Sequence, residues 1–279
     1  MAPSTIKPFL VDSLLYCFVT MGKHLVCAVT GGSQGIGYAI AEKMISHNCT
    51  VYNLDINKPK NTTSVPSGGT TPTHSTSIFL KTDISNPKEI SERLQHIYET
   101  EKKFDVMVNN AGIFETAENV NRCWDDLVSC DTIDSILKTN LGGVIHGTRV
   151  ASQIMKEQRA SYSKNAMAPK IINIASTAAL GPFPDHPVYA STKAAVLHFS
   201  QIADIDLRDT YGIRVHCICP GIIDTGTFYC SLHCIPSRQN FMKVLFTCCI
   251  LPHKTITILN TFYIPLPPHN GIAFFDFDI

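Results

Sequence analysis

The chain has 279 residues, of which 44% are hydrophobic and 9% aromatic, and this content excludes a chain that is disordered throughout. Its 23 basic and 23 acidic residues cancel to a formal net charge of zero, which argues against a protein that binds nucleic acid through the phosphates. The eleven cysteines follow no disulfide framework, so we expect reduced, mostly buried thiols and a cytoplasmic protein.

The first residues of the chain are expected to form an N-terminal extension, residues 1–22, ahead of the folded domain. Residues 9–21 are apolar but short, they contain Asp12, and no small-residue cleavage site follows them. A secretory signal is therefore not favoured, and no apolar run is long enough to predict a membrane span.

Between residues 25 and 219, short apolar runs alternate with helical patterns. The expected strands are 25–30, 50–55, 77–83, 104–110, 170–176 and 213–219, and the expected helices are 36–47, 86–102, 132–158 and 188–210. Nearly continuous hydrophobicity is typical of parallel strands that are covered on both faces. The pattern predicts an α/β fold with a Rossmann-type doubly wound parallel sheet, strand order 3-2-1-4-5-6. Residues 57–77 and 159–169 are polar and are predicted to be loops.

A glycine-rich segment, TGGSQGIG at 30–37, lies where the first strand should end and the first helix should begin. Backbone N–H groups at such a helix start bind the pyrophosphate of a dinucleotide, and glycines let the main chain approach it. An ordinary glycine turn is the alternative interpretation, which the strand–turn–helix context makes weaker. The expected cofactor contacts in this segment are Gly31, Ser33, Gln34, Gly35, Ile36 and Gly37.

Asp55 ends the second expected strand, 18 residues after Gly37. A carboxylate at this place accepts hydrogen bonds from the adenosine ribose hydroxyls and repels a 2′-phosphate. Ser33 and Gln34 carry no positive charge that would bind such a phosphate. The sequence therefore predicts NAD as the cofactor rather than NADP.

Tyr189 and Lys193 are spaced to lie on one face of a helix, and Ser176 ends the fifth expected strand at the edge where doubly wound sheets bind ligands. An ammonium one turn away is expected to lower the pKa of the phenol, so that Tyr189 can act as a general base. Ser176 is expected to hydrogen-bond the reacting substrate oxygen. A second pair of the same spacing, Tyr98 and Lys102, precedes a strand at the opposite edge and receives no function.

These segments, taken in order, resemble the short-chain dehydrogenase/reductase family over roughly residues 23–225. The resemblance depends on the glycine turn, Asp83-Ile84, NNAG at 109–112, Asn140 in KTNLGG, Ser176, YASTK at 189–193 and PGIIDT at 220–225. Within the family, Asp55 makes the chain similar to NAD-dependent alcohol oxidisers such as hydroxyprostaglandin dehydrogenases.

The resemblance implies specific roles. Asn140, Ser176, Tyr189 and Lys193 would form a catalytic tetrad, in which Asn140 holds a water of the proton relay and Lys193 also binds the nicotinamide ribose. Asp83 and Ile84 would flank the adenine, and Asn110 would line the cofactor cleft. Ile222 and Thr225 would contact the nicotinamide end.

Residues 226–279 lack the amphipathic helix and final strand with which the family usually ends. We interpret them as an atypical C-terminal tail, an alternative or mis-joined ending. On this interpretation the sheet lacks its seventh strand, its exposed edge favours aggregation, and a homo-oligomer is not favoured.

Two further features allow more than one interpretation. Cysteine and histidine side chains are close in sequence at Cys217, Cys219, Cys230, His233 and Cys234, but the spacing fits no common zinc pattern, so packing is expected and no metal site. His186 lies near the expected reaction centre, and a solvated loop histidine is favoured over a pocket-wall role.

The sequence therefore predicts one NAD-binding domain, residues 23–225, that transfers a hydride between NAD and a small-molecule secondary alcohol or ketone, with Tyr189 as general acid/base. The alternative is an NAD-binding sensor or scaffold with little turnover. An NADP-dependent reductase is a third candidate, against which Asp55 argues.

Overall fold

The fold comes from a computed structural model that describes residues 24–59, 76–115, 129–159 and 168–221, together with two short strands, 247–251 and 255–258. The segments 1–23, 60–75, 116–128, 160–167, 222–246, 252–254 and 259–279 lie outside the described residues. The predicted N-terminal extension, most of both predicted polar loops, and residues Ile222, Thr225, Cys230, His233 and Cys234 fall among these segments.

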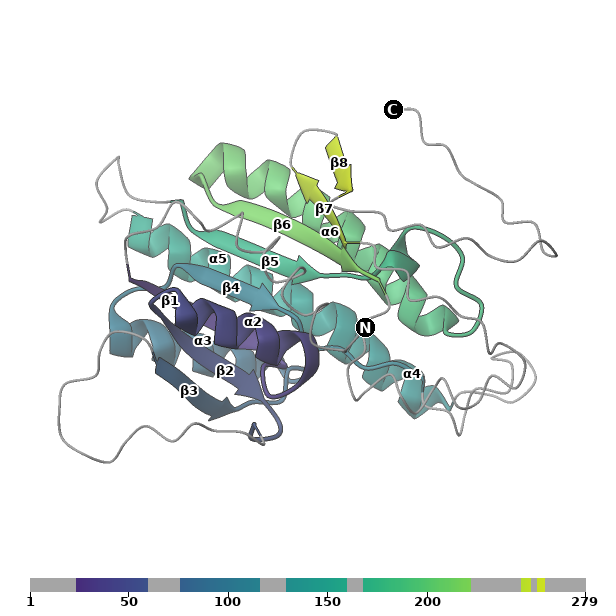
Figure 1. The fold of residues 1–279 in the computed structure, drawn as a ribbon, viewed down its shortest axis with the longest axis horizontal. Helices are drawn as coiled ribbons and strands as arrows, with labels where there is room; N and C mark the ends of the chain where they lie inside the picture. The colour runs from purple at the N-terminus through teal and green to yellow at the C-terminus, as the bar shows by residue number, and fades with distance from the viewer. Residues whose placement is uncertain are drawn as a thin grey trace, which may run out of the picture.

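The centre of the molecule is a single parallel sheet in the predicted order (Figure 1). Its strands lie in the order β3-β2-β1-β4-β5-β6, and each neighbouring pair is parallel. Their bounds are β1 Leu25–Thr30, β2 Cys49–Asp55, β3 Thr76–Lys81, β4 Val106–Asn109, β5 Lys170–Ile174 and β6 Arg214–Pro220. The predicted doubly wound sheet is confirmed.

The helices also follow the predicted pattern. They are α2 Gly35–Ser46, α3 Pro87–Glu101, α4 Cys130–Leu137, α5 Gly143–Arg159 and α6 Pro187–Tyr211, with a π-helical turn at Lys138–Gly142 between α4 and α5 and a 3₁₀ turn at Thr177–Ala179. The expected single helix at 132–158 is thus interrupted by the π turn. No helix in the described ranges is long and apolar enough to span a bilayer.

Alternate residues of β1 explain why the sheet is covered on both faces. Leu25, Cys27 and Val29 pack with Ile40 and Met44 of α2 on one face. The intervening residues of β1 pack in a second cluster that contains side chains of α3, α5 and α6 on the other face. Because both faces of the sheet are buried, successive residues of a strand can all be apolar, which explains the nearly continuous hydrophobic runs in the sequence.

The edge of the sheet beyond β6 differs from the expectation. Two further strands, β7 Thr247–Leu251 and β8 Thr255–Ile258, pair antiparallel, β7 with β6 and β8 with β7. The expectation that the sheet lacks a seventh strand was therefore wrong. An edge strand such as β6 presents unpaired N–H and C=O groups, with which another extended segment can form hydrogen bonds. The sequences of β7 and β8 are rich in β-branched residues, which favour such strands.

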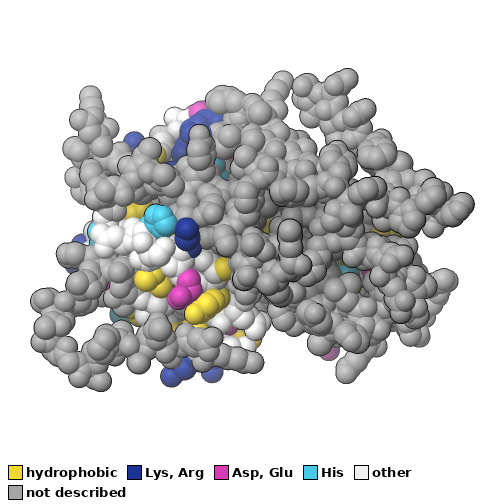
Figure 2. Space-filling view, viewed as in Figure 1, with side chains coloured by type: hydrophobic (Ala, Val, Ile, Leu, Met, Phe, Trp, Pro, Cys, Tyr) yellow, Lys and Arg dark blue, Asp and Glu magenta, His cyan; other side chains and the backbone are white. Residues whose placement is uncertain are grey.

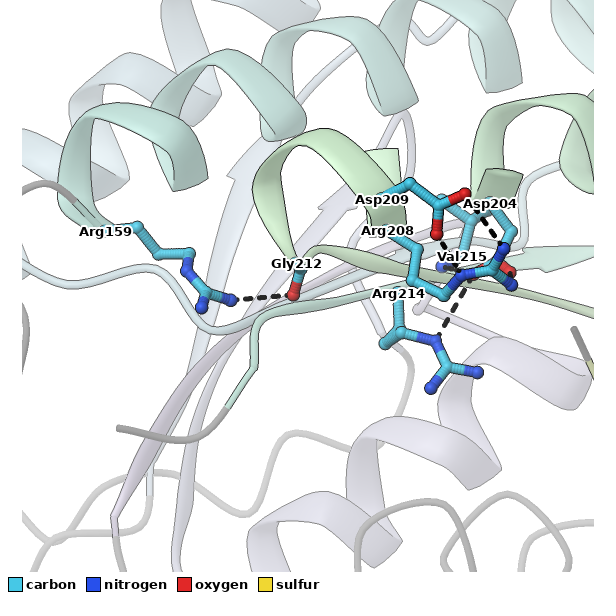
Figure 3. Close-up of polar contacts among 7 residues, drawn as sticks. All are labelled: Arg159, Asp204, Arg208, Asp209, Gly212, Arg214 and Val215. Atoms are coloured by element: carbon cyan, nitrogen blue, oxygen red, sulfur yellow. Dashed lines mark hydrogen bonds and ion pairs between the residues drawn. The ribbon is translucent and has the colours of Figure 1, made fainter. Parts of the chain in front are cut away.

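The return from α6 into β6 is fixed by charged side chains (Figure 3). Gly212 ends α6 with a φ of 62°, and its carbonyl oxygen accepts a hydrogen bond of 2.7 Å from Arg159 Nη1. Asp204, which is 3% exposed, accepts the N–H of Val215 at 2.9 Å and contacts the guanidinium groups of Arg208 and Arg214. This network holds the helix that carries Tyr189 and Lys193 against the strand beside it.

The described surface in the view of Figure 2 carries basic, acidic and histidine side chains next to hydrophobic ones. In this view, basic side chains are visible at more places on the described surface than acidic ones.

Candidate active site

A cavity of about 600 Å³ opens at the carboxyl ends of the parallel strands. It is lined from the side of β1 and β2 by the glycine turn and Asp55, and from the side of β5 and α6 by Ser176, Tyr189 and Lys193. The fold thus brings together segments that the sequence separates by more than one hundred residues. The predicted cofactor residues that line this cavity are Gly31, Gln34, Gly35, Ile36, Asp55, Asp83, Ile84, Asn110, Tyr189 and Lys193.

The glycine turn shows why glycine is required there. Gly31 and Gly35 have φ values of 65° and 59°, in the left-handed region that side chains with a Cβ rarely adopt. A Cβ on Gly37 would overlap the carbonyl oxygen of Gly31 and the side-chain amide of Asn110. Gly37 therefore shapes the turn from behind and does not line the cavity.

Asn110 fastens this turn to β4. Its Nδ2 donates to the carbonyl oxygens of Thr30 at 3.0 Å and Gly31 at 3.2 Å. In return, Thr30 Oγ1 accepts the N–H groups of Asn110 and Ala111 at 2.9 and 3.0 Å. Asn110 was predicted only to line the cleft, and the structure shows that it also holds the glycine turn in place.

Asp55 stands at the end of β2 with 9% of its surface exposed. Its Oδ2 accepts the N–H of Ser33 at 3.0 Å and its Oδ1 accepts the N–H of Asn57 at 3.0 Å. Ser33 is buried behind the wall, where its hydroxyl donates to the carbonyl of Asn57, and it does not line the cavity. Ser33 thus orients the carboxylate from the protein side.

Asp83 and Ile84 continue the same wall after β3. Asp83 Oδ1 accepts the N–H and the hydroxyl of Ser85 at 2.8 and 2.7 Å. Ile84 is 7% exposed and lies so close to Gly143 that a Cβ there would meet its side chain.

On the opposite wall, Tyr189 and Ser176 both line the cavity. Burial raises the pKa of Tyr189, and the neighbouring Ser176 side chain only partly opposes this. Lys193 is 3% exposed, and burial lowers its pKa to about 8. Its Nζ donates to the carbonyl of Ile174 at 2.9 Å and lies 5.5 Å from the centroid of the Tyr189 ring.

The direction of the Tyr189 pKa is the opposite of the one expected from the Tyr–Lys spacing. Lys193 directs its ammonium at a main-chain carbonyl rather than at the phenol oxygen, and desolvation of the phenolate is the dominant influence on Tyr189. The protein by itself therefore favours the protonated phenol.

Asn140 lies in the π turn and is fully buried, so its side chain does not line the cavity. Its Oδ1 accepts the N–H of Ile113 at 2.8 Å, and its Nδ2 donates to the carbonyl of Ile113 at 2.7 Å and to Thr192 Oγ1 at 3.2 Å. Thr192 in turn donates to the carbonyl of Tyr189. The side chain of Asn140 thus joins the β4 loop to the helix of Tyr189.

The second Tyr–Lys pair is separate from this cavity. Tyr98 lies on α3 and packs against the hydrophobic core, and Lys102 is the left-handed residue that ends α3, with a φ of 55°. Neither residue lines the cavity.

His186 was expected to be solvated, and this was wrong. It is 6% exposed, lines the cavity, and stacks on Phe183 with ring centroids 5.7 Å apart. Its Nδ1 lies 3.5 Å from Oε2 of Glu115, a residue that sequence reasoning missed. Glu115 follows the NNAG motif by three residues, and nothing in its local pattern indicated that it would be buried.

The fold and the site define a Rossmann-type oxidoreductase. A protein-family model described as short chain dehydrogenase matches residues 25–229 of this chain. The chain therefore belongs to the short-chain dehydrogenase/reductase family, whose chemistry is hydride transfer.

Curated relatives and solved structures agree with this assignment. The chain is 28% identical over 202 residues to the mouse 15-hydroxyprostaglandin dehydrogenase, whose name specifies NAD(+), covering 72% of this chain and 68% of the relative. It is 31% identical over 197 residues to a 3-oxoacyl-(acyl-carrier-protein) reductase of Chlamydia muridarum, covering 71% and 73%. A Brucella melitensis 3-ketoacyl-(acyl-carrier-protein) reductase, solved in complex with NADH, superimposes with a TM-score of 0.63 at 25% identity, covering 74% and 78% of the two chains.

Proposed function

We propose that this chain transfers a hydride between NAD and a secondary alcohol or ketone, with Tyr189 as the general acid/base. The observation that carries the proposal is that Ser176, Tyr189 and the buried Lys193 line one wall of the cavity that also contains the glycine turn. A tyrosine with a purely structural role would not require Ser176 and Lys193 beside it in a cavity.

The residues present fit a nicotinamide dinucleotide. The left-handed glycines keep side chains away from the start of α2, where main-chain N–H groups and the helix dipole favour a phosphate. The buried carboxylate of Asp55 supports NAD over NADP, because a ribose 2′-phosphate beside it would add a second negative charge. When bound, the oxidised nicotinamide would accept the hydride, and its positive charge would make the phenolate less costly.

Each residue of the cavity wall and its support would have a separate role in the reaction. Ser176 would hold the substrate oxygen within reach of Tyr189. The phenol would remove the hydroxyl proton during oxidation or donate a proton to the carbonyl oxygen during reduction. Lys193 would bind the nicotinamide ribose with the donor hydrogens that Ile174 leaves unused, and Asn140 would keep the helix of Tyr189 in register with the β4 loop.

We also propose that residues 23–225 form the catalytic domain, which the family match to residues 25–229 supports. A cytoplasmic location is proposed from the cysteines. The described thiols of Cys27, Cys49, Cys130 and Cys217 form no disulfide, as expected in a reducing compartment.

The test is an assay of the full chain with NAD or NADP and a panel of secondary alcohols, followed by the absorbance of the reduced cofactor. We expect turnover with NAD, a preference over NADP of about 100-fold in kcat/KM, and a loss of about 1,000-fold in kcat for Tyr189→Phe.

Tyr98→Phe is the matched control, because it removes the hydroxyl of the other Tyr–Lys pair, and its kcat should stay within about twofold of wild type. Cofactor binding without turnover of any alcohol would favour the sensor alternative. Unchanged kcat in Tyr189→Phe would refute the proposed mechanism.

A further inference from the structure

The first turn of α6 has no cap from its own neighbourhood. The residue before it, His186, makes no side-chain capping bond, and Pro187 has no N–H to offer. The first N–H groups of a helix need acceptors from elsewhere. Here Glu115, distant in sequence, provides one: its Oε1 accepts the N–H of Val188 at 2.9 Å and that of Tyr189 at 3.2 Å.

Glu115 is buried with 1% of its surface exposed, and its second oxygen faces another polar side chain. Oε2 lies 3.5 Å from Nδ1 of His186, at the distance of an ion pair. Burial would raise the pKa of Glu115, but His186 and the main-chain donors outweigh burial and hold that pKa below its ordinary value. Glu115 is therefore a carboxylate, and a negative charge is favourable at a helix N-terminus.

The segment 113–115 contacts the π turn and the start of α6 at once. Ile113 exchanges both of its main-chain hydrogen bonds with the side chain of Asn140. The ring of Phe114 meets those of His186 and Tyr189 edge-on, at centroid distances of 5.4 and 6.1 Å. Three consecutive residues thus connect the π turn with the start of α6.

We propose that Glu115 is a positioning residue of the reaction, which fixes the first turn of α6 and so holds the phenol of Tyr189 against Ser176. This inference rests on the function proposed above. Glu115 does not line the cavity, so it acts through Tyr189 and His186 rather than by touching the substrate.

The charge of Glu115 also acts on Tyr189. After desolvation, which is the largest influence and is partly opposed by Ser176, the Glu115 carboxylate raises the pKa of Tyr189, and Cys219 adds to this. Within the described part of the chain, the Lys193 ammonium above the ring and His186 beyond Glu115 are further ionisable groups that face this region. Removing the charge of Glu115 while keeping an acceptor oxygen should therefore lower the pKa of Tyr189.

Two variants separate the cap from the charge. Glu115→Gln keeps an oxygen that can accept the N–H groups of α6, and we expect the acid limb of the pH profile for alcohol oxidation to move down by at least about half a pH unit. Glu115→Ala removes the cap, and we expect kcat to fall about 10- to 100-fold with KM for NAD nearly unchanged. Asn86→Ala is the matched control, because it removes the N-cap of α3, whose side chain accepts the N–H of Lys88, and kcat should not change.

A readout independent of turnover keeps the two proposals distinguishable. The phenol of Tyr189 can be titrated by NMR of chains labelled with carbon-13 at the tyrosine ring, with Tyr189→Phe to assign the signal. We expect a lower pKa of Tyr189 in Glu115→Gln even if no alcohol on the panel is turned over. An unchanged titration in Glu115→Gln, or a folded Glu115→Ala with wild-type kcat, would overturn the proposal.

Discussion

The two halves of the cavity are built in different ways. On the side of β1–β3, the wall is built around the glycine turn, a continuous run of eight residues whose main chain is hydrogen-bonded by Asn110 and Asp55. On the side of β4–β6, the wall is made of side chains from the β4 loop, the π turn, the end of β5 and α6, and each depends on a partner from another element. The first half is a local backbone shape, and the second is a set of long-range contacts.

This difference predicts how each half fails. A single added Cβ can disrupt a tightly turned main chain completely. In a network of side chains, each substitution removes only part of the function.

The largest effect is expected at Gly37, on the main-chain side. Gly37→Ala places a Cβ against the carbonyl of Gly31 and the amide of Asn110. We therefore expect the free energy of unfolding to fall by at least about 3 kcal/mol. Affinity for NAD, measured by calorimetry, should fall at least about 100-fold. Gly181→Ala is the control, since a Cβ there meets nothing within 4 Å, and it should change stability by less than about 0.5 kcal/mol. Normal NAD affinity in Gly37→Ala would remove the distinction between the halves.

The next effect is expected at Asn140, on the side-chain side. Asn140→Ala removes, from a fully buried position, the side chain that bonds both main-chain groups of Ile113, and we expect a loss of about 1–2 kcal/mol in the free energy of unfolding, measured with denaturant. Alcohol oxidation should fall strongly while NAD affinity stays within a few-fold, because the glycine turn does not depend on Asn140. A parallel loss of NAD affinity would show that the two halves are coupled.

An effect of opposite sign is expected at Lys193. Its pKa is lowered from 10.5 to about 8 by burial, so the folded state disfavours the charged ammonium. Below pH 8 the amine is protonated in both states and this cost is fully present. Between pH 8 and 10.5 the unfolded chain binds more protons than the folded one, so the Lys193 contribution to stability rises with pH.

Lys193→Met should therefore be more stable than wild type at pH 7 by about 2 kcal/mol, and inactive. The difference in the free energy of unfolding should shrink as the pH rises from 8 to 10. Lys88→Met, at an exposed lysine, should show neither effect. A Lys193→Met variant that is less stable at every pH would mean that its ammonium supports the fold.

The sequence predicted the sheet order and most element bounds because parallel strands buried on both faces leave near-continuous apolar runs. It also predicted the glycine turn, since residues 30–37 are contiguous and their glycines answer a local backbone demand. Ser176, Tyr189 and Lys193 were found through their positions at the ends and starts of elements, and the structure brings them into one cavity.

Other features depended on contacts between residues far apart in the chain. The burial of His186, the cap that Glu115 places on α6, and the amide of Asn140 bonded to Ile113 have no signature in local spacing. The antiparallel β7 and the raised pKa of Tyr189 have the same origin, because edge pairing and desolvation are set by what the folded chain places nearby. The order of strands and helices and the glycine turn follow from local patterns in the sequence itself. The hydrogen-bond partners, the burial and the charge environment of each site residue depend on long-range contacts, which only the tertiary structure determines.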